Sequence, residues 1–125
     1  MKSMIQTEFA PKAIGPYSQA IQAGNTFYFS GQIPLDPKTM ALISDDFKQQ
    51  AVQTFLNLQA VAKAAGGDLD KLVKLTIYLT DLTQFPVFNE VMTKFFKEPY
   101  PARTTIQVSA LPKNAQVEVD AVMVI

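Results

Sequence analysis

Two alternating stretches near the end of this chain, PARTTIQV at residues 101–108 and VEVDAVMVI at residues 117–125, decide its fold. Strand side chains point alternately to opposite faces, so each stretch predicts a strand with one apolar face. In the first stretch, Ile106 and Val108 share the face that we expect to meet a core. The second stretch places its apolar residues on one face as well: Val117, Val119, Ala121, Met123 and Ile125.

The same alternation puts Arg103 and Glu118 opposite these apolar sets, so we expect both to project from the other side of one sheet. A guanidinium and a carboxylate on stiff elements suit the binding of a small organic acid and the control of a water or proton beside it. The alternative is that both are solvated charges on an exposed sheet face, which the pattern alone slightly favours.

Length and charge restrict the class of protein. A chain of 125 residues predicts a single domain, residues 1–125, large enough to bury a core. Charged residues make up only 18%, which indicates that part of the surface is covered in an oligomer. Lys and Arg together number 11, as do Asp and Glu, so the basic excess typical of nucleic-acid binders is missing and we expect no nucleic-acid partner.

Missing residue types restrict the chemistry further. The chain has no cysteine and no histidine, which excludes disulfides, thiol nucleophiles and Ser-His triads. Almost every zinc, copper or haem site is excluded for the same reason, so we expect no metal. The N-terminal residues contain no apolar signal-peptide core, and no apolar run approaches the length of about 18 residues that a membrane span needs. We therefore expect a cytoplasmic protein without a membrane partner.

The remaining pattern predicts an α+β domain. We expect further strands at residues 3–7, 18–22, 26–30 and 72–80, with a hairpin turn at Gly24-Asn25. A helix is predicted from an N-cap at Ser44 to Gly66-Gly67, and a second from about Pro86 to 96 or 97. This order favours two helices on one face of a mostly antiparallel or mixed sheet, whose bare face is left for another subunit.

Five blocks occur in order along the chain: GPYSQA at 15–20, FSGQIP at 29–34, FNEV at 88–91, PART at 101–104 with LPK at 111–113, and VEV at 117–119. Together they resemble the RidA (YjgF) family of enamine/imine deaminases over essentially the whole chain. The resemblance implies a chorismate-mutase-like, RidA-type α+β fold. It also implies a homotrimer, with the sheets as an inner barrel, the helices outside and three clefts between subunits.

The resemblance implies an activity without cofactor or metal: hydrolysis of reactive imines such as 2-iminobutyrate and 2-iminopropanoate to 2-oxo acids and ammonia. Arg103 matches the arginine that pairs with the substrate carboxylate, for which a planar guanidinium is suited. Glu118 matches the acidic residue that would orient the water and stabilise the protonated imine. Tyr17 matches a tyrosine that would position the substrate through its hydroxyl group. These three are the expected catalytic residues.

Four further residues match substrate-binding positions of the family. Ser30 and Gly31 would offer a backbone N–H and a close approach of the chain, which a glycine permits because it lacks a Cβ atom. Asn89 matches a polar residue at the edge of the cleft. The backbone of Thr105 is expected to contact the substrate, although many family members carry cysteine there. The threonine puts in doubt any role of a thiol at this position.

The spacing of the two charged residues raises a geometric question. If the last two strands formed a hairpin about residues 111–114, Arg103 and Glu118 would be about four residues out of register, or ~13 Å apart. Either the strands are not paired with each other, or the site takes residues from two chains, and we favour the second explanation.

Three functions remain open from the sequence. The first is the imine deaminase. The second is a non-catalytic, regulatory protein that binds a 2-oxo acid in the same cleft, which would need Arg103 but not necessarily Glu118. The third is an RNA-directed activity such as translation inhibition or RNA cleavage, which a chain with no net charge and no histidine makes the weakest of the three.

Overall fold

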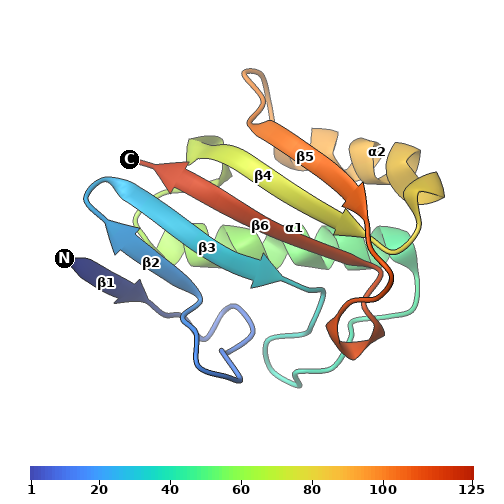
Figure 1. Ribbon diagram of the computed structural model, residues 1–125, viewed down its shortest axis with the longest axis horizontal. Coiled ribbons are helices and arrows are strands. Elements are labelled where there is room, and N and C mark those ends of the chain that lie inside the picture. The colour runs from blue at the N-terminus through green and yellow to red at the C-terminus, as the bar shows by residue number, and fades with distance from the viewer.

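A single mixed sheet with two helices on one face forms the protein (Figure 1). The computed structural model describes residues 1–125. The strands lie in the order β1-β2-β3-β6-β4-β5. Their bounds are β1 Lys2–Ile5, β2 Ala20–Ala23, β3 Thr26–Gln32, β4 Leu72–Leu79, β5 Ala102–Gln107 and β6 Val117–Val124, and the helices are α1 Phe47–Ala64 and α2 Phe85–Phe95. Short 3-10 helices lie at Leu69–Lys71, Leu82–Gln84 and Pro112–Asn114.

The last two strands are not neighbours. β6 pairs antiparallel with β3 on one side and with β4 on the other, and β5 pairs with the far edge of β4 in the parallel direction. Parallel strands need a long crossover, and α2 supplies it between β4 and β5. Of the two explanations given for the spacing of Arg103 and Glu118, the first therefore holds: their strands are not paired with each other, because β4 lies between them.

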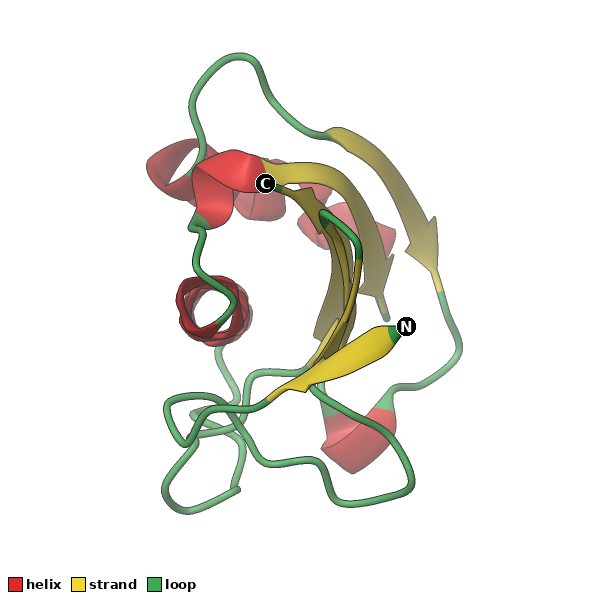
Figure 2. Ribbon diagram, turned by 90° about the vertical axis from the view of Figure 1, so that its left-hand side faces the viewer, coloured by secondary structure: helices red, strands yellow, loops and turns green.

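Both helices cover the same face of the sheet, and the other face is bare (Figure 2). The buried core lies between these layers, with Phe55 of α1 near its centre. Its ring stands 5.3–5.4 Å from the rings of three residues on and after α2: Phe88, Phe95 and Phe96. Neither helix has the length and apolar character needed to cross a lipid bilayer.

The predicted helices are confirmed, with one change of cap. Asp46, not Ser44, is the N-cap of α1, and its carboxylate accepts a hydrogen bond of 2.9 Å from the backbone N–H of Gln49. The hydroxyl group of Ser44 accepts from the N–H of Asp46 and so shapes the turn before the helix. Gly66, with φ +94°, follows the helix as predicted, since only glycine adopts this conformation at little cost.

The predicted phase of β5 is wrong. Ile106 was expected to face the core, yet it is 41% exposed on the bare face, in register with Tyr78. Arg103 and Thr105 lie instead on the helix-covered face, in register with the buried Leu75 and Ile77 of β4. The reason is that β5 is an edge strand. Its pairing register with β4 and the helix above it, and not hydrophobicity, determine which of its side chains point toward the helices.

A buried amide holds the segment that leads to β2. Gln19 is 3% exposed, and its Oε1 accepts a hydrogen bond of 2.7 Å from the N–H of Thr7. Its Nε2 donates to the carbonyl groups of Thr7 and Pro11 at 3.1 and 2.8 Å. One side chain therefore satisfies the backbone of a loop that has no sheet or helix partners of its own.

We predict that Gln19→Ala destabilises the protein by about 1–3 kcal/mol, because the backbone groups that it satisfies are left buried and unpaired. Urea unfolding at a fixed protein concentration measures this change. The exposed Gln6 is the matched control, and Gln6→Ala should change stability by no more than about 0.5 kcal/mol. Equal effects of the two substitutions would show that the Gln19 bonds add nothing to stability.

Candidate active site

Arg103, the only arginine in the chain, is held by uncharged groups of α2. Its Nη1 donates to Oδ1 of Asn89 at 2.6 Å and contacts the sulfur of Met92 at 3.4 Å. The guanidinium carbon stands 4.9 Å from the centroid of the Phe85 ring. The single ion pair of the structure joins Lys48 and Glu90, so no carboxylate of the chain neutralises Arg103. An unneutralised, half-buried guanidinium is suited to receive an anion.

A pocket of about 300 Å³ lies beside this arginine. It is lined by residues of α2 and of the segment that enters β5: Asn89, Met92, Thr93, Tyr100, Pro101 and Arg103. Its volume is at the small end of the range for ligand sites, which suits a small organic acid. Four of these, Met92, Thr93, Tyr100 and Pro101, were not predicted from the sequence as site residues.

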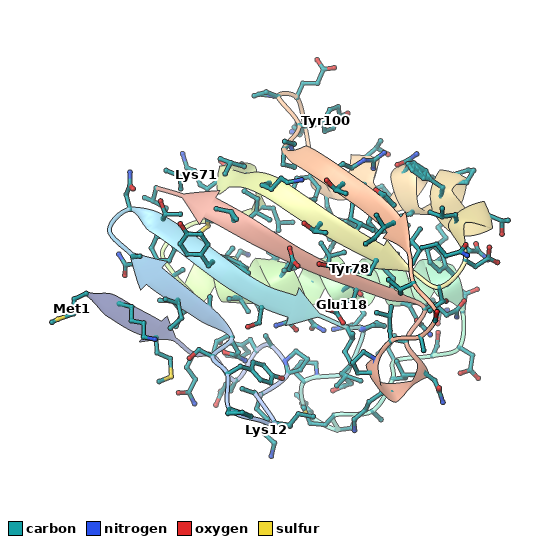
Figure 3. All side chains as sticks on the ribbon, in the orientation of Figure 1. Met1, Lys12, Lys71, Tyr78, Tyr100 and Glu118 are labelled. Carbon is teal, nitrogen blue, oxygen red and sulfur yellow. The ribbon has the colours of Figure 1, made fainter.

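Glu118 lies on the opposite, bare face of the sheet, in register with Tyr78 of β4. Figure 3 shows both side chains on the face turned toward the viewer, with the helices behind the sheet. A Cβ atom built on Gly31 would collide with the Glu118 carboxylate, whose Cδ would be 2.8 Å away. The glycine at position 31 therefore makes room for the carboxylate of Glu118.

The environment of Glu118 perturbs the pKa of its carboxyl group. Partial burial raises the pKa of the carboxyl group, and the nearby negative charge of Asp120 raises this pKa further. Asp120 also accepts a hydrogen bond of 3.0 Å from the hydroxyl group of Tyr78. Burial and this aspartate together raise the pKa of Tyr78. Tyr78 and Asp120 were not identified from the sequence, although Asp120 shares the face of Glu118 two residues on.

Ser30 precedes Gly31 in β3 and is bonded to the segment that carries Tyr17. The hydroxyl group of Ser30 donates to the carbonyl of Ser18 at 2.6 Å, and its N–H donates to the carbonyl of Gln19 at 3.0 Å. Ser30 thus fixes the loop that carries Tyr17, and its own N–H is already bonded rather than free for a ligand. Tyr17 is 51% exposed, and its hydroxyl group accepts a long hydrogen bond of 3.5 Å from the N–H of Ile14.

Six of the seven predicted site residues therefore fall into two groups on opposite faces of the sheet, and Tyr17 lies outside the sheet in the loop before β2. Arg103, Asn89 and Thr105 belong to the helix-covered face at the β5 edge, and Glu118 and Gly31 belong to the bare face with Ser30. The expectation that Arg103 and Glu118 project from one side is wrong, because the β4 register gives their strands opposite phases. One subunit does not bring the two charges together.

Thr105 adds an unusual feature on the helix-covered face. Its Oγ1 is buried and has no hydrogen-bond partner within the chain. An unpaired buried hydroxyl group costs stability, whereas a sulfhydryl group, which bonds weakly, would cost less at the same place.

No three acidic side chains lie close enough together to hold a metal ion.

We predict that Glu118→Gln makes the protein more stable at neutral pH. A raised pKa means that the folded protein binds the Glu118 proton more tightly than the unfolded chain, so stability falls as the pH rises from the usual glutamate range through the raised pKa. Glutamine cannot ionise, so the stability difference between variant and wild type should grow across that interval. Urea unfolding at a series of pH values measures it. A difference that is constant with pH, or one matched by Glu98→Gln at an exposed site, would contradict the assignment.

Comparison with known proteins places this geometry in a family. A family model described as Endoribonuclease L-PSP matches residues 7–125. A protein of Dermatophagoides farinae named 2-iminobutanoate/2-iminopropanoate deaminase is 44% identical over 124 residues, which is 99% of this chain and 97% of that protein.

Solved structures agree with this match. RidA of the Antarctic bacterium Psychrobacter superposes with a TM-score of 0.95 at 50% identity, covering 98% of this chain and 99% of that one. TdcF of E. coli, solved with bound serine, superposes with a TM-score of 0.93 at 39% identity, covering 98% of each chain. The fold, the match over nearly the whole length and the identity to these relatives together show that the chain belongs to the RidA (YjgF) family.

Proposed function

We propose that this protein is a deaminase that hydrolyses reactive 2-imino acids, such as 2-iminobutyrate and 2-iminopropanoate, to 2-oxo acids and ammonia. The observation that carries the proposal is the unneutralised guanidinium of Arg103 beside a small pocket. Such a group binds the carboxylate that every 2-imino acid carries. The name of the Dermatophagoides relative and membership of the RidA family support the same reaction class.

Each step of the proposed reaction has a residue to perform it. Arg103 holds the substrate carboxylate. The adjacent carbon of the imine, whose nitrogen is protonated, is thereby presented to water. The Glu118 carboxylate, with its raised pKa, takes a proton from the attacking water as the C–O bond forms, and returns this proton to the nitrogen of the resulting carbinolamine. The C–N bond then breaks, and the remaining hydroxyl proton leaves to solvent as the C=O bond forms. Water supplies the oxygen of the 2-oxo acid, and the nitrogen leaves as ammonia. The proposed role of Tyr17 is to position the substrate through its hydroxyl group.

The proposed site is completed between subunits of a homotrimer, since Arg103 and Glu118 lie on opposite faces within one chain. The bare face of the sheet supports this assembly, because it exposes large side chains at its edge and centre. Tyr28, on this face in register with Val122, is 53% exposed, and Ile106 is 41% exposed. A neighbouring subunit on this face would cover them and bring its own Arg103 toward Glu118 of this chain.

Two other functions would use the chain differently. A non-catalytic binder of 2-oxo acids would need the Arg103 pocket but not the raised pKa of Glu118, so the carboxylate on the bare face favours the enzyme. The description of the family model names an endoribonuclease. An RNA-directed activity finds less support in this chain, because its 11 basic residues are balanced by 11 acidic ones.

We predict that the wild-type protein increases 2-oxobutyrate formation when it is coupled to a threonine dehydratase with semicarbazide present to trap free imine. Arg103→Ala should lower kcat/KM about 100-fold or more, since it removes the charged carboxylate contacts. Glu118→Gln should lower kcat about 100-fold or more while 2-oxo acid binding persists. Glu98→Gln is the control at an exposed site and should leave the rate unchanged. Wild-type binding without turnover on any imine would favour the regulatory function.

We predict that two inactive variants restore each other when their subunits are mixed. If each site takes Arg103 from one chain and Glu118 from the next, refolding equal amounts of Arg103→Ala and Glu118→Gln together should restore about a quarter of the wild-type activity, because one site in four has both native residues. Sedimentation should first show that the protein is a trimer. Mixed trimers without activity, or full activity of a monomer, would overturn the shared site.

A further inference from the structure

Three side chains of α2 form a clamp on the guanidinium of Arg103. Phe85, Asn89 and Met92 are spaced at i, i+4 and i+7, so they lie along one face of the helix, above β5. Phe85 presents its ring to the guanidinium carbon at 4.9 Å, and Asn89 and Met92 contact Nη1. An aromatic face attracts a cation without neutralising it.

The clamp occupies one end of the guanidinium and leaves one edge open. Nη1 carries two N–H groups, and the structure gives it two partners, Oδ1 of Asn89 at 2.6 Å and the sulfur of Met92 at 3.4 Å. Nε and Nη2 of Arg103 make no hydrogen bond within the chain. Their N–H groups point in nearly parallel directions, which is the arrangement that meets both oxygens of a carboxylate.

We propose that Phe85 and Asn89 are positioning residues that fix Arg103 so that its Nε–Nη2 edge receives the ligand carboxylate. Asn89, which the family resemblance assigned to the substrate, acts here through the arginine. The inference relies on the proposed function only for the carboxylate of the ligand, and the orientation of the arginine can be measured without turnover.

Two properties of the clamp explain its composition. The Asn89 amide offers an oxygen acceptor without a charge, so the arginine keeps its positive charge for the ligand. An aspartate at position 89 would hold the same nitrogen but would neutralise the guanidinium and repel the incoming carboxylate. The ring of Phe85 limits the rotation of the guanidinium plane, so less conformational entropy is lost when the ligand binds.

The composition of the chain makes the test direct. Because Arg103 is its only arginine, the protein gives a single Nε–H signal in an arginine-selective NMR spectrum when the sample contains no other source of arginine. In the wild type we expect a dispersed signal, shifted by the ring current of Phe85, that moves further when 2-oxobutyrate is added. The dissociation constant of 2-oxobutyrate from the same titration measures binding independently of any deaminase activity.

Four variants separate orientation from charge. Phe85→Leu and Asn89→Ala should move the free-state signal toward that of a mobile arginine and weaken 2-oxobutyrate binding about threefold to thirtyfold, the range expected for loss of one such contact. Phe85→Tyr keeps the ring and should keep both the signal and the affinity. Asn89→Asp should keep the guanidinium ordered yet weaken binding roughly tenfold or more, since the new charge competes with the ligand.

Phe95→Leu is the matched control, because Phe95 is a half-buried phenylalanine of the same helix that packs on Phe55 instead of Arg103. It should lower stability and leave the arginine signal and the affinity unchanged. An Asn89→Ala variant that loses affinity with an unchanged free-state signal would show that Asn89 contacts the ligand directly, and would overturn the inference. The inference would also be overturned if the arginine signal of the wild-type protein did not change when 2-oxobutyrate was added. Binding of 2-oxobutyrate without turnover of any imine would support the positioning role of the clamp and contradict the proposed deaminase activity.

Discussion

The central strand β6 is the constraint on which the rest of the structure depends. It pairs along both edges, with β3 and β4, and its core-facing residues are at most 3% exposed: Val117, Val119, Ala121 and Met123. Because alternate residues must point to opposite faces, burying this set places Glu118 and Asp120 on the bare face. A slip of one residue would bury both carboxylates under the helices. The position of the proposed catalytic acid is therefore a consequence of how the core is packed.

The edge of the sheet is governed differently. β5 joins the sheet through the α2 crossover and pairs only with β4, so its outer edge and one face remain available. Its residues are half-buried or exposed throughout, and hydrophobicity exerts little control over which face is inward. Arg103 is accommodated beneath α2 because the helix offers it an amide, a thioether and an aromatic ring. The chain thus carries its cation and its perturbed carboxylate on separate faces, each of which supplies one half of the proposed site.

Buried side-chain amides fix the loops around these halves. Gln50 of α1 donates to the carbonyl of Ser44 and accepts from the N–H of Gln116, just before β6. Asn57 donates to the carbonyl groups of Ile33 and Leu35, in the loop that follows Gly31. Both amides are about 1% exposed. Polar residues on a helix are expected to face solvent, so a periodic pattern cannot reveal that these two replace missing backbone partners for irregular segments.

Local periodicity determined the two helices, the strands and the α+β class, since alternation and helical spacing are properties of neighbouring residues. The sequence also singled out Arg103, Glu118 and Gly31 and, through its motif blocks, the family. The tertiary structure decided which strands are neighbours, and with that the opposite faces of Arg103 and Glu118 and the exposure of Ile106. It also decided the contacts of Phe85 and Asn89 with the arginine. Strand order and the approach of a helix to an edge strand are long-range choices, set by the packing of the whole sheet, that no short stretch of sequence encodes.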